Sequence, residues 1–209
     1  PNPHHNPGEE QLTHPDLLLS LPGYDEGWER RISNNKHLFK HLAEVLSKNP
    51  TDPPSLVERL SMDMASVREP NFIYPVGDPV YVHVHTDPST KEFIYHPIEP
   101  RLEVHREEIL AEVERRMALE IDEKMDAKSN EEMERLIYRL LDKILGRRVL
   151  KVEDVGNVAF DDDMYERLKY EIYCEKIGMS ILEPMIRDMY IEDIHCSGVG
   201  PIFIDHKIF

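Results

Sequence analysis

Three histidines near the middle of the chain have a spacing that could bind a metal ion. His83 and His85 alternate with valines in "YVHVHT", and His96 lies in the apolar segment after the next turn. Alternate residues of a β-strand face the same side, so His83 and His85 could meet a zinc ion together with His96 from a neighbouring strand. Histidine is also common on a solvated strand face, and the sequence places no acidic or cysteine ligand with the three. We therefore assign no catalytic, cofactor-binding or metal residue, and keep the three histidines as candidate ligands only.

Two other groups of reactive residue types have structural explanations. The acidic run Asp161–Asp163 lacks the alternating oxygen ligands of a calcium loop, whereas acids at a helix N-terminus are favoured by the helix dipole. We expect this run to cap the helix that follows it. His195 and Cys196 are adjacent in a predicted strand, so their side chains point to opposite faces and do not form a joint ligand pair. Cys196 is expected to be a small buried residue.

The chain lacks the motifs by which many enzymes bind nucleotides or activate nucleophiles. Its 209 residues contain no G-x-x-x-x-G-K-[ST] phosphate loop, no G-x-G-x-x-G turn, no C-x-x-C pair and no G-x-S-x-G elbow. From its residues alone, the chain is interpreted as an acidic interaction module that does not hydrolyse ATP by itself.

Charge and composition exclude several kinds of partner. The net charge is −16, from 41 acidic and 25 basic residues, and the largest basic groups are the pairs Arg115–Arg116 and Arg147–Arg148. Such a chain repels phosphate backbones, so nucleic acid is not an expected partner. The two cysteines, the lack of an opening signal segment and the lack of an apolar run near the ~20 residues that span a bilayer favour a reduced, cytoplasmic protein.

The first part of the chain is predicted to be an arm followed by a small helical module. Residues 1–31 are rich in proline, histidine, asparagine and glycine, and we expect an extended or flexible arm whose His4, His5 and His14 bind no metal. Residues 32–68 are interpreted as two amphipathic helices.

The two predicted helices of this module have different signals. An apolar stripe from Leu38 to Leu46 indicates the first helix, and Asn49 followed by proline ends it. Ser55 and Glu58 have capping-box spacing, which predicts a second, short helix that begins at Ser55.

Residues 69–209 are predicted to form one α+β domain, in which antiparallel hairpins pack against amphipathic helices. The elements expected first are a proline-rich connector at 69–79, a hairpin at 80–98 and a helix with apolar residues every fourth position from Ile109 to Ile121. Helices that begin near 129 and 161, a short strand at 150–152, a short helix from 181 and a last hairpin at 191–206 are expected after them. The fold class is therefore α+β.

The last 29 residues, "ILEPMIRDMYIEDIHCSGVGPIFIDHKIF", resemble a segment of the type II/IV secretion-system ATPases. This family includes the archaeal GspE-like motors that assemble pili and archaella, and the segment stands before their motor domain. The residues that fit its pattern are Leu182, Pro184, Arg187, Asp188, Ile191, Glu192, Asp193, Ile194, Gly198, Gly200 and His206. Met189 stands where the family usually has proline. The segment "YVHVHTDPSTKEFIYHPIEPRLEVHREEIL" is more loosely similar to a hairpin and helix of the same proteins, so the resemblance covers roughly residues 75–209.

The resemblance implies a parent protein that forms a hexameric ring. An N-terminal α+β region packs over a RecA-like motor that binds ATP and Mg²⁺, and the partners would be that motor, neighbouring subunits and a membrane platform protein. Phe209 precedes the expected phosphate loop, so the chain is interpreted as an N-terminal fragment that binds no cofactor of its own. The resemblance implies that it is cytoplasmic and reaches the membrane only through partner proteins. Two alternatives stay open: a small metal-binding enzyme that uses His83, His85 and His96, and a free-standing acidic scaffold protein.

Overall fold

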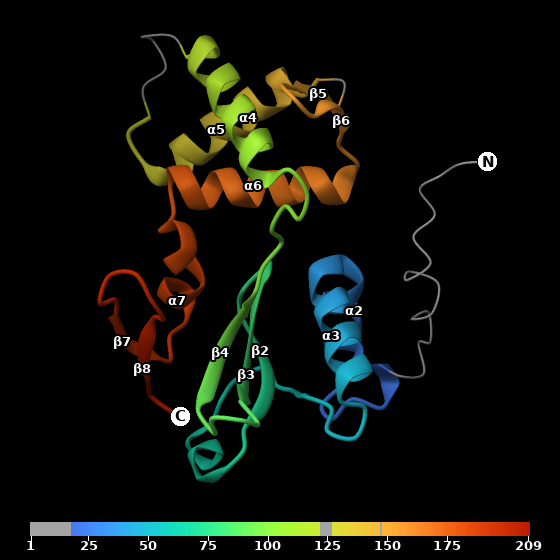
Figure 1. Cartoon of the computed structure of the whole chain (residues 1–209), viewed down its shortest axis with the longest axis vertical. Helices are drawn as coiled ribbons and strands as arrows, with labels where there is room; N and C mark the ends of the chain where they lie inside the picture. Colours follow the sequence, from blue (N-terminus) through green and yellow to red (C-terminus); the bar gives the residue numbers. More distant parts are fainter. Residues whose placement is uncertain (1–17, 122–126, 147) are drawn as a thin grey trace, which may run out of the picture. The chain divides into compact units, whose positions relative to one another are not determined.

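The computed structural model describes residues 18–121, 127–146 and 148–209, and it confirms an α+β fold (Figure 1). The chain forms two compact units. Unit 1 contains the residues up to Glu99 together with Arg187–Phe209, and unit 2 contains Pro100–Ile186. Unit 2 is thus inserted into the sequence of unit 1. Among the described residues, no helix combines the length and apolarity needed to cross a bilayer.

Unit 1 is built on a four-stranded sheet with the order β1-β2-β3-β4. The strands are β1 (Ser55–Leu56), β2 (Asn71–Gly77), β3 (Val80–Thr86) and β4 (Phe93–Ile98). β1 is parallel to β2, and the other neighbours are antiparallel. The predicted hairpin at 80–98 is confirmed as β3 and β4.

The segment predicted as a proline-rich connector contains β2, so this prediction was wrong. A proline cannot donate a hydrogen bond to a neighbouring strand, and it is tolerated at strand ends and bulges. Pro70 and Pro79 lie outside the strand, and Pro75 stands where the pairing with β3 shifts register. The prolines therefore leave the rest of the strand free to pair on both sides.

Helices α2 (Glu26–Asn34) and α3 (Lys36–Lys48) cover one face of this sheet (Figure 1). Asp25 caps α2 by accepting a hydrogen bond from the backbone N–H of Trp28 at 2.9 Å. Trp28 is 1% exposed and packs in a core with Ile73 and Tyr81 of the sheet. The predicted arm therefore does not extend to residues 26–31, because Trp28 anchors a helix there. The remainder of the predicted arm up to residue 17, with its three histidines, lies outside the described residues.

The first helix of the predicted module is confirmed as α3, but the prediction of a second helix that begins at Ser55 was wrong. Ser55 and Leu56 form β1, which pairs with Phe72 and Ile73, and only residues 62–66 form a short 3-10 helix. Glu58 does not complete a capping box; its carboxylate lies 2.8 Å from the guanidinium of Arg31 on α2. Pairing with the sheet has overridden the local capping signal.

The C-terminal hairpin consists of β7 (Ile191–His195) and β8 (Phe203–His206). The opposite face of the sheet is covered by residues that flank this hairpin, Tyr190, Ile208 and Phe209, and by residues of the segment 57–64. A second core forms there from Leu60, Tyr74, Val82, Val84 and Ile208. The structure therefore groups residues on both sides of the predicted 68/69 boundary in one unit, because both faces of a single sheet are buried. It also separates residues 100–186 from the rest of the predicted 69–209 domain.

Unit 2 contains three amphipathic helices and a two-stranded ribbon. Its elements are α4 (Arg106–Glu120), α5 (Asn130–Ile144), β5 (Val149–Val152), β6 (Gly156–Ala159), α6 (Asp162–Lys176) and a 3-10 helix at Ser180–Leu182, after which α7 (Glu183–Arg187) leads back to unit 1. Ser129 caps α5 and Asp161 caps α6, as predicted. Glu171 is fully buried and binds the guanidinium groups of Arg101 and Arg106.

Candidate functional site

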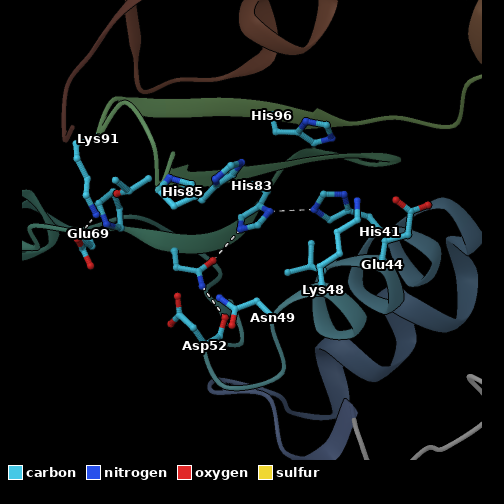
Figure 2. Close-up of a pocket in the computed structure, with 15 residues that line it drawn as sticks. His41, Glu44, Lys48, Asn49, Asp52, Glu69, His83, His85, Lys91 and His96 are labelled. Atoms are coloured by element: carbon cyan, nitrogen blue, oxygen red, sulfur yellow. Dashed lines mark hydrogen bonds and ion pairs between the residues drawn. The ribbon is translucent and has the colours of Figure 1, made fainter.

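Four histidines surround a pocket of about 510 Å³ in unit 1 (Figure 2). His83 and His85 come from β3, His96 comes from β4, and His41 comes from α3. The structure thus brings together the three histidines that the sequence suggested. Polar and charged residues on the pocket wall are Glu44, Lys48, Asn49, Asp52, Glu69, Asn71 and Lys91.

Sheet register and helix periodicity explain why these side chains meet. His83 pairs directly with His96 across β3 and β4, and His85 lies two residues from His83 on the same face. On α3, His41 is followed by pocket residues at spacings of three, four and seven: Glu44, Val45 and Lys48. This polar stripe runs beside the apolar stripe of the helix. It is the sequence signal that would have identified His41, which our sequence reasoning missed.

A chain of hydrogen bonds fixes two of the imidazole rings. The side-chain amide of Asn71 donates to the carbonyl of Asp52 at 3.0 Å, so its oxygen faces His83 Nε2 at 2.8 Å. Because an amide oxygen can only accept, His83 carries its proton on Nε2, and His83 Nδ1 accepts from His41 Nε2 at 3.0 Å. His41 therefore has its lone pair on Nδ1.

Burial keeps these imidazoles uncharged at neutral pH. Desolvation, aided by the neighbouring histidines, lowers the pKa of His83 to about 2 and that of His41 to about 3. Burial also lowers the pKa of His96, with His85 acting in the same direction and Glu44 opposing it. His41, His83 and His96 therefore offer nitrogen lone pairs and N–H groups to the pocket rather than positive charge.

The hydrogen bonds argue against the metal site in the form suggested by the sequence. Both ring nitrogens of His83 already have partners, His41 and Asn71, so His83 cannot bind a metal without losing one of them. Within residues 18–121, 127–146 and 148–209, no group of three histidine, cysteine, aspartate or glutamate side chains is arranged so that it could hold a metal ion. Thr86 also lines the pocket, and its hydroxyl oxygen is buried without a hydrogen-bond partner.

A second polar cluster ties the C-terminal hairpin to the sheet. The carboxylate of Asp188, which is 4% exposed, accepts hydrogen bonds from the hydroxyl groups of Tyr74 at 2.6 Å and Tyr95 at 3.0 Å. It also accepts one from the backbone N–H of Tyr190 at 2.9 Å. Burial and the charge of Asp188 raise the pKa of both Tyr74 and Tyr95. We call Asp188, Tyr74, Tyr95, Tyr190 and His206 the Asp188 anchor.

His206 joins this anchor from β8. Because Tyr74 donates its only hydroxyl proton to Asp188, the contact of 3.3 Å between Tyr74 and His206 requires His206 Nε2 to donate. His206 Nδ1 then accepts from the backbone N–H groups of Ile208 and Phe209. Two residues of the secretion-ATPase resemblance, Asp188 and His206, thus hold the hairpin and the end of the chain on the sheet.

The other sequence candidates lie apart from both clusters. His195 is exposed and lies 3.1 Å from Asp205 across the hairpin. Cys196 is exposed, which corrects the prediction that it is buried: β7 ends at His195, so Cys196 lies in the loop that follows. The hairpin loop contains Gly198 with φ of 106°, a conformation that favours glycine.

The chain was compared with protein families and with known proteins. No family model matches the chain. It is similar to an uncharacterized protein of Methanocaldococcus jannaschii, MJ0900, with 30% identity over 190 residues. The matched segment is 85% of this chain and 34% of that relative, so the chain spans about a third of the relative's length.

Proposed function

We propose that the chain is a non-catalytic, N-terminal regulatory and assembly domain of a secretion- or pilus-type ATPase. The observation that carries the proposal is the Asp188 anchor. Asp188 and His206 belong to the segment that resembles this family, and the buried Asp188 and the partly buried His206 both contact Tyr74 of the sheet. Most of the length of the Methanocaldococcus relative lies outside the matched segment, which is compatible with a further domain in such proteins.

The anchor supports a mechanical role for unit 1. A ring ATPase must convert nucleotide state into movement of whole domains, and a lever for such movement has to be stiff. Hydrogen bonds to a buried carboxylate are among the stronger ones in proteins, and those of Asp188 tie the segment just before β7 to β2 and β4. His206 adds a contact between β8 and β2. A motor domain that follows β8 in the parent protein would then pull on the sheet through the hairpin.

The proposal also assigns partners and location. The partners are the motor domain, the neighbouring subunits of the ring and a membrane platform protein, and ATP and Mg²⁺ bind to the motor. The domain is cytoplasmic and reaches the membrane only through its partners. The net charge of −16 would suit a partner with a basic surface.

The alternative of a metal-dependent enzyme at His83, His85 and His96 has less support. His83 would have to give up a hydrogen bond in order to bind metal. A free-standing scaffold protein is compatible with the two units, but it gives no reason for the secretion-ATPase pattern around Asp188.

The test is to read the coding sequence that follows residue 209 and to purify its complete product. We expect a phosphate loop of the G-x-x-x-x-G-K-[ST] type downstream and a ring-sized oligomer by light scattering when ATP is present. A coding sequence without a phosphate loop would refute the proposal and leave the scaffold hypothesis as the better one.

A further inference from the structure

We propose that the pocket of unit 1 binds a free α-amino acid as its zwitterion. The carboxylate of Glu44 and the Nδ1 atom of His41 receive the ammonium group of the ligand, and Lys48 receives its carboxylate. All three residues line the pocket from α3. This site goes beyond the proposed assembly role and does not depend on it.

Two pairs of opposite charge line the pocket, one on each side in Figure 2. Lys91 and Glu69 form an ion pair at 3.2 Å, so their charges offset each other. Glu44 and Lys48 are four residues apart on α3, and side chains at this spacing are neighbours on one helix face. Within the described residues, neither of these two has an ion-pair partner. The α3 side of the pocket therefore presents one acid and one base that are both available to a ligand.

Glu44 and Lys48 also lie near the histidines of the pocket. After the larger effect of burial, the charge of Lys48 lowers the pKa of both His41 and His96. Glu44 acts on His96 in the opposite direction. Because such effects weaken with distance, and because the ring centres of His41 and His96 are 5.0 Å apart, both charges belong to the same end of the pocket.

His41 supplies a hydrogen-bond acceptor at this end. It donates Nε2–H to His83, so its Nδ1 carries a lone pair, which has no partner in the part of the chain that the structure describes. An N–H of a ligand can therefore donate to His41 and leave the bond between His83 and Asn71 intact. With Glu44 three residues further along the same helix, His41 forms an acceptor pair of the kind that an ammonium group requires.

The presence of both signs of charge decides the class of ligand. An amine without a carboxylate would be repelled by Lys48, and a carboxylate without an amine would be repelled by Glu44. An α-amino acid carries both groups on one carbon atom and satisfies both residues. Asp52 also lines the pocket, so its acids exceed its bases by one, and a ligand with an acidic side chain is disfavoured.

The rest of the pocket offers space and contacts for the side chain of the ligand. Its volume of about 510 Å³ lies within the range of roughly 300–1,000 Å³ that is typical of small-molecule sites. Val45, Pro70 and Pro88 contribute apolar surface. The hydroxyl oxygen of Thr86 is buried on the wall without a hydrogen-bond partner within the described residues, and a polar group of the ligand would supply one.

The experiment begins with a thermal-unfolding screen of the chain against each common L-amino acid. Fluorescence of Trp28, the single tryptophan, reports on unit 1, and a ligand that binds only the folded state raises the unfolding midpoint. Free tryptophan is tested by calorimetry instead, because it fluoresces itself. The most strongly stabilising amino acid is then titrated by calorimetry, beside its N-acetyl derivative, which lacks the ammonium group, and its amide, which lacks the carboxylate.

The same titration is made on two pocket variants and two matched controls. The pocket variants are Glu44→Gln and Lys48→Gln, and the controls are Glu92→Gln and Lys36→Gln, which do not line the pocket. All four residues are exposed, so the unfolding midpoint of each variant without ligand checks that it is folded as the unchanged chain is.

We expect one amino acid to bind per chain. Each pocket variant, and each blocked derivative, should bind about five- to tenfold more weakly, because one interaction with a charged partner is lost at an exposed site. The controls should bind as the unchanged chain does, and aspartate and glutamate should bind weakest. Absence of saturable binding by every amino acid would overturn the site. Binding that Glu44→Gln and Lys48→Gln leave unchanged, or equal binding of the blocked derivatives, would also overturn it.

Discussion

Removal of the Asp188 carboxylate should destabilise unit 1 more than any other single change in the Asp188 anchor. Asp188→Ala removes the carboxylate that accepts from the buried hydroxyl of Tyr74, the partly buried hydroxyl of Tyr95 and the partly buried backbone N–H of Tyr190. A hydrogen bond to a charged group contributes about 1.5–3 kcal/mol and water can reach the two partly buried donors, so the loss in unfolding free energy should be roughly 2–5 kcal/mol. Tyr95→Phe removes one hydrogen bond to a charged acceptor and should cost about 1.5–3 kcal/mol.

The single tryptophan of the chain gives an assay that reports on unit 1 alone. Trp28 is 1% exposed in the core between α2, α3 and the sheet. Urea unfolding followed by its fluorescence therefore measures unit 1 without a contribution from unit 2. With a urea dependence of about 1–3 kcal/mol per molar, the loss from Tyr95→Phe should lower the midpoint by roughly 1 M. Tyr24→Phe is the matched control, because Tyr24 makes no side-chain hydrogen bond within the described residues.

A double-mutant cycle separates the anchor from general packing loss. The variant that combines Asp188→Ala with Tyr95→Phe should lose less stability than the sum of the two single losses, because Asp188→Ala has already removed the hydrogen bond between Tyr95 and Asp188. If Asp188→Ala shifted the midpoint no more than Tyr24→Phe, or if the two losses were simply additive, the anchor would not hold the hairpin as described.

Three further predictions concern other parts of the chain. Asp25→Ala removes the cap of α2 and should lower the unfolding free energy of unit 1 by about 1 kcal/mol, measured by Trp28 fluorescence. Burial alone would raise the pKa of Glu171, but its hydrogen bonds and ion pairs with two arginines outweigh burial and lower the pKa. Unit 2 should therefore lose stability as the pH falls below about 4.5. Circular dichroism should show that Glu171→Gln is less stable than the unchanged chain at neutral pH and loses less of its stability in acid. Thiol titration of the folded chain should modify Cys196, which is exposed, and leave Cys174, which is fully buried, unreacted until urea is added.

Much of the fold was predictable because its helices and hairpins carry strong local patterns. The stripe that ends at Leu46, the cap at Ser129 and the alternation around Val82 each specify an element without help from the rest of the chain. Elements that depend on distant partners were missed. β1 exists because Ser55 and Leu56 pair with β2, and α2 is a short helix that is stabilised by burial of Trp28 against the sheet.

The candidate site was predictable only in part for the same reason. Strand alternation placed His83, His85 and His96 on one face, and the structure confirms that they line one pocket. The polar stripe of α3 could have indicated His41, but the place of His41 beside His83 depends on how α3 packs on the sheet. The engagement of both nitrogens of His83 depends on Asn71, in a segment that was predicted to be a connector.

We propose that this chain couples to an ATPase motor and has no catalysis of its own. The most direct measurement is Mg²⁺-dependent ATP hydrolysis, made side by side on residues 1–209 and on the complete product of the gene. We expect no turnover by residues 1–209 and clear turnover by the complete product. Hydrolysis by residues 1–209 alone, or none by the complete product once it has assembled, would contradict it.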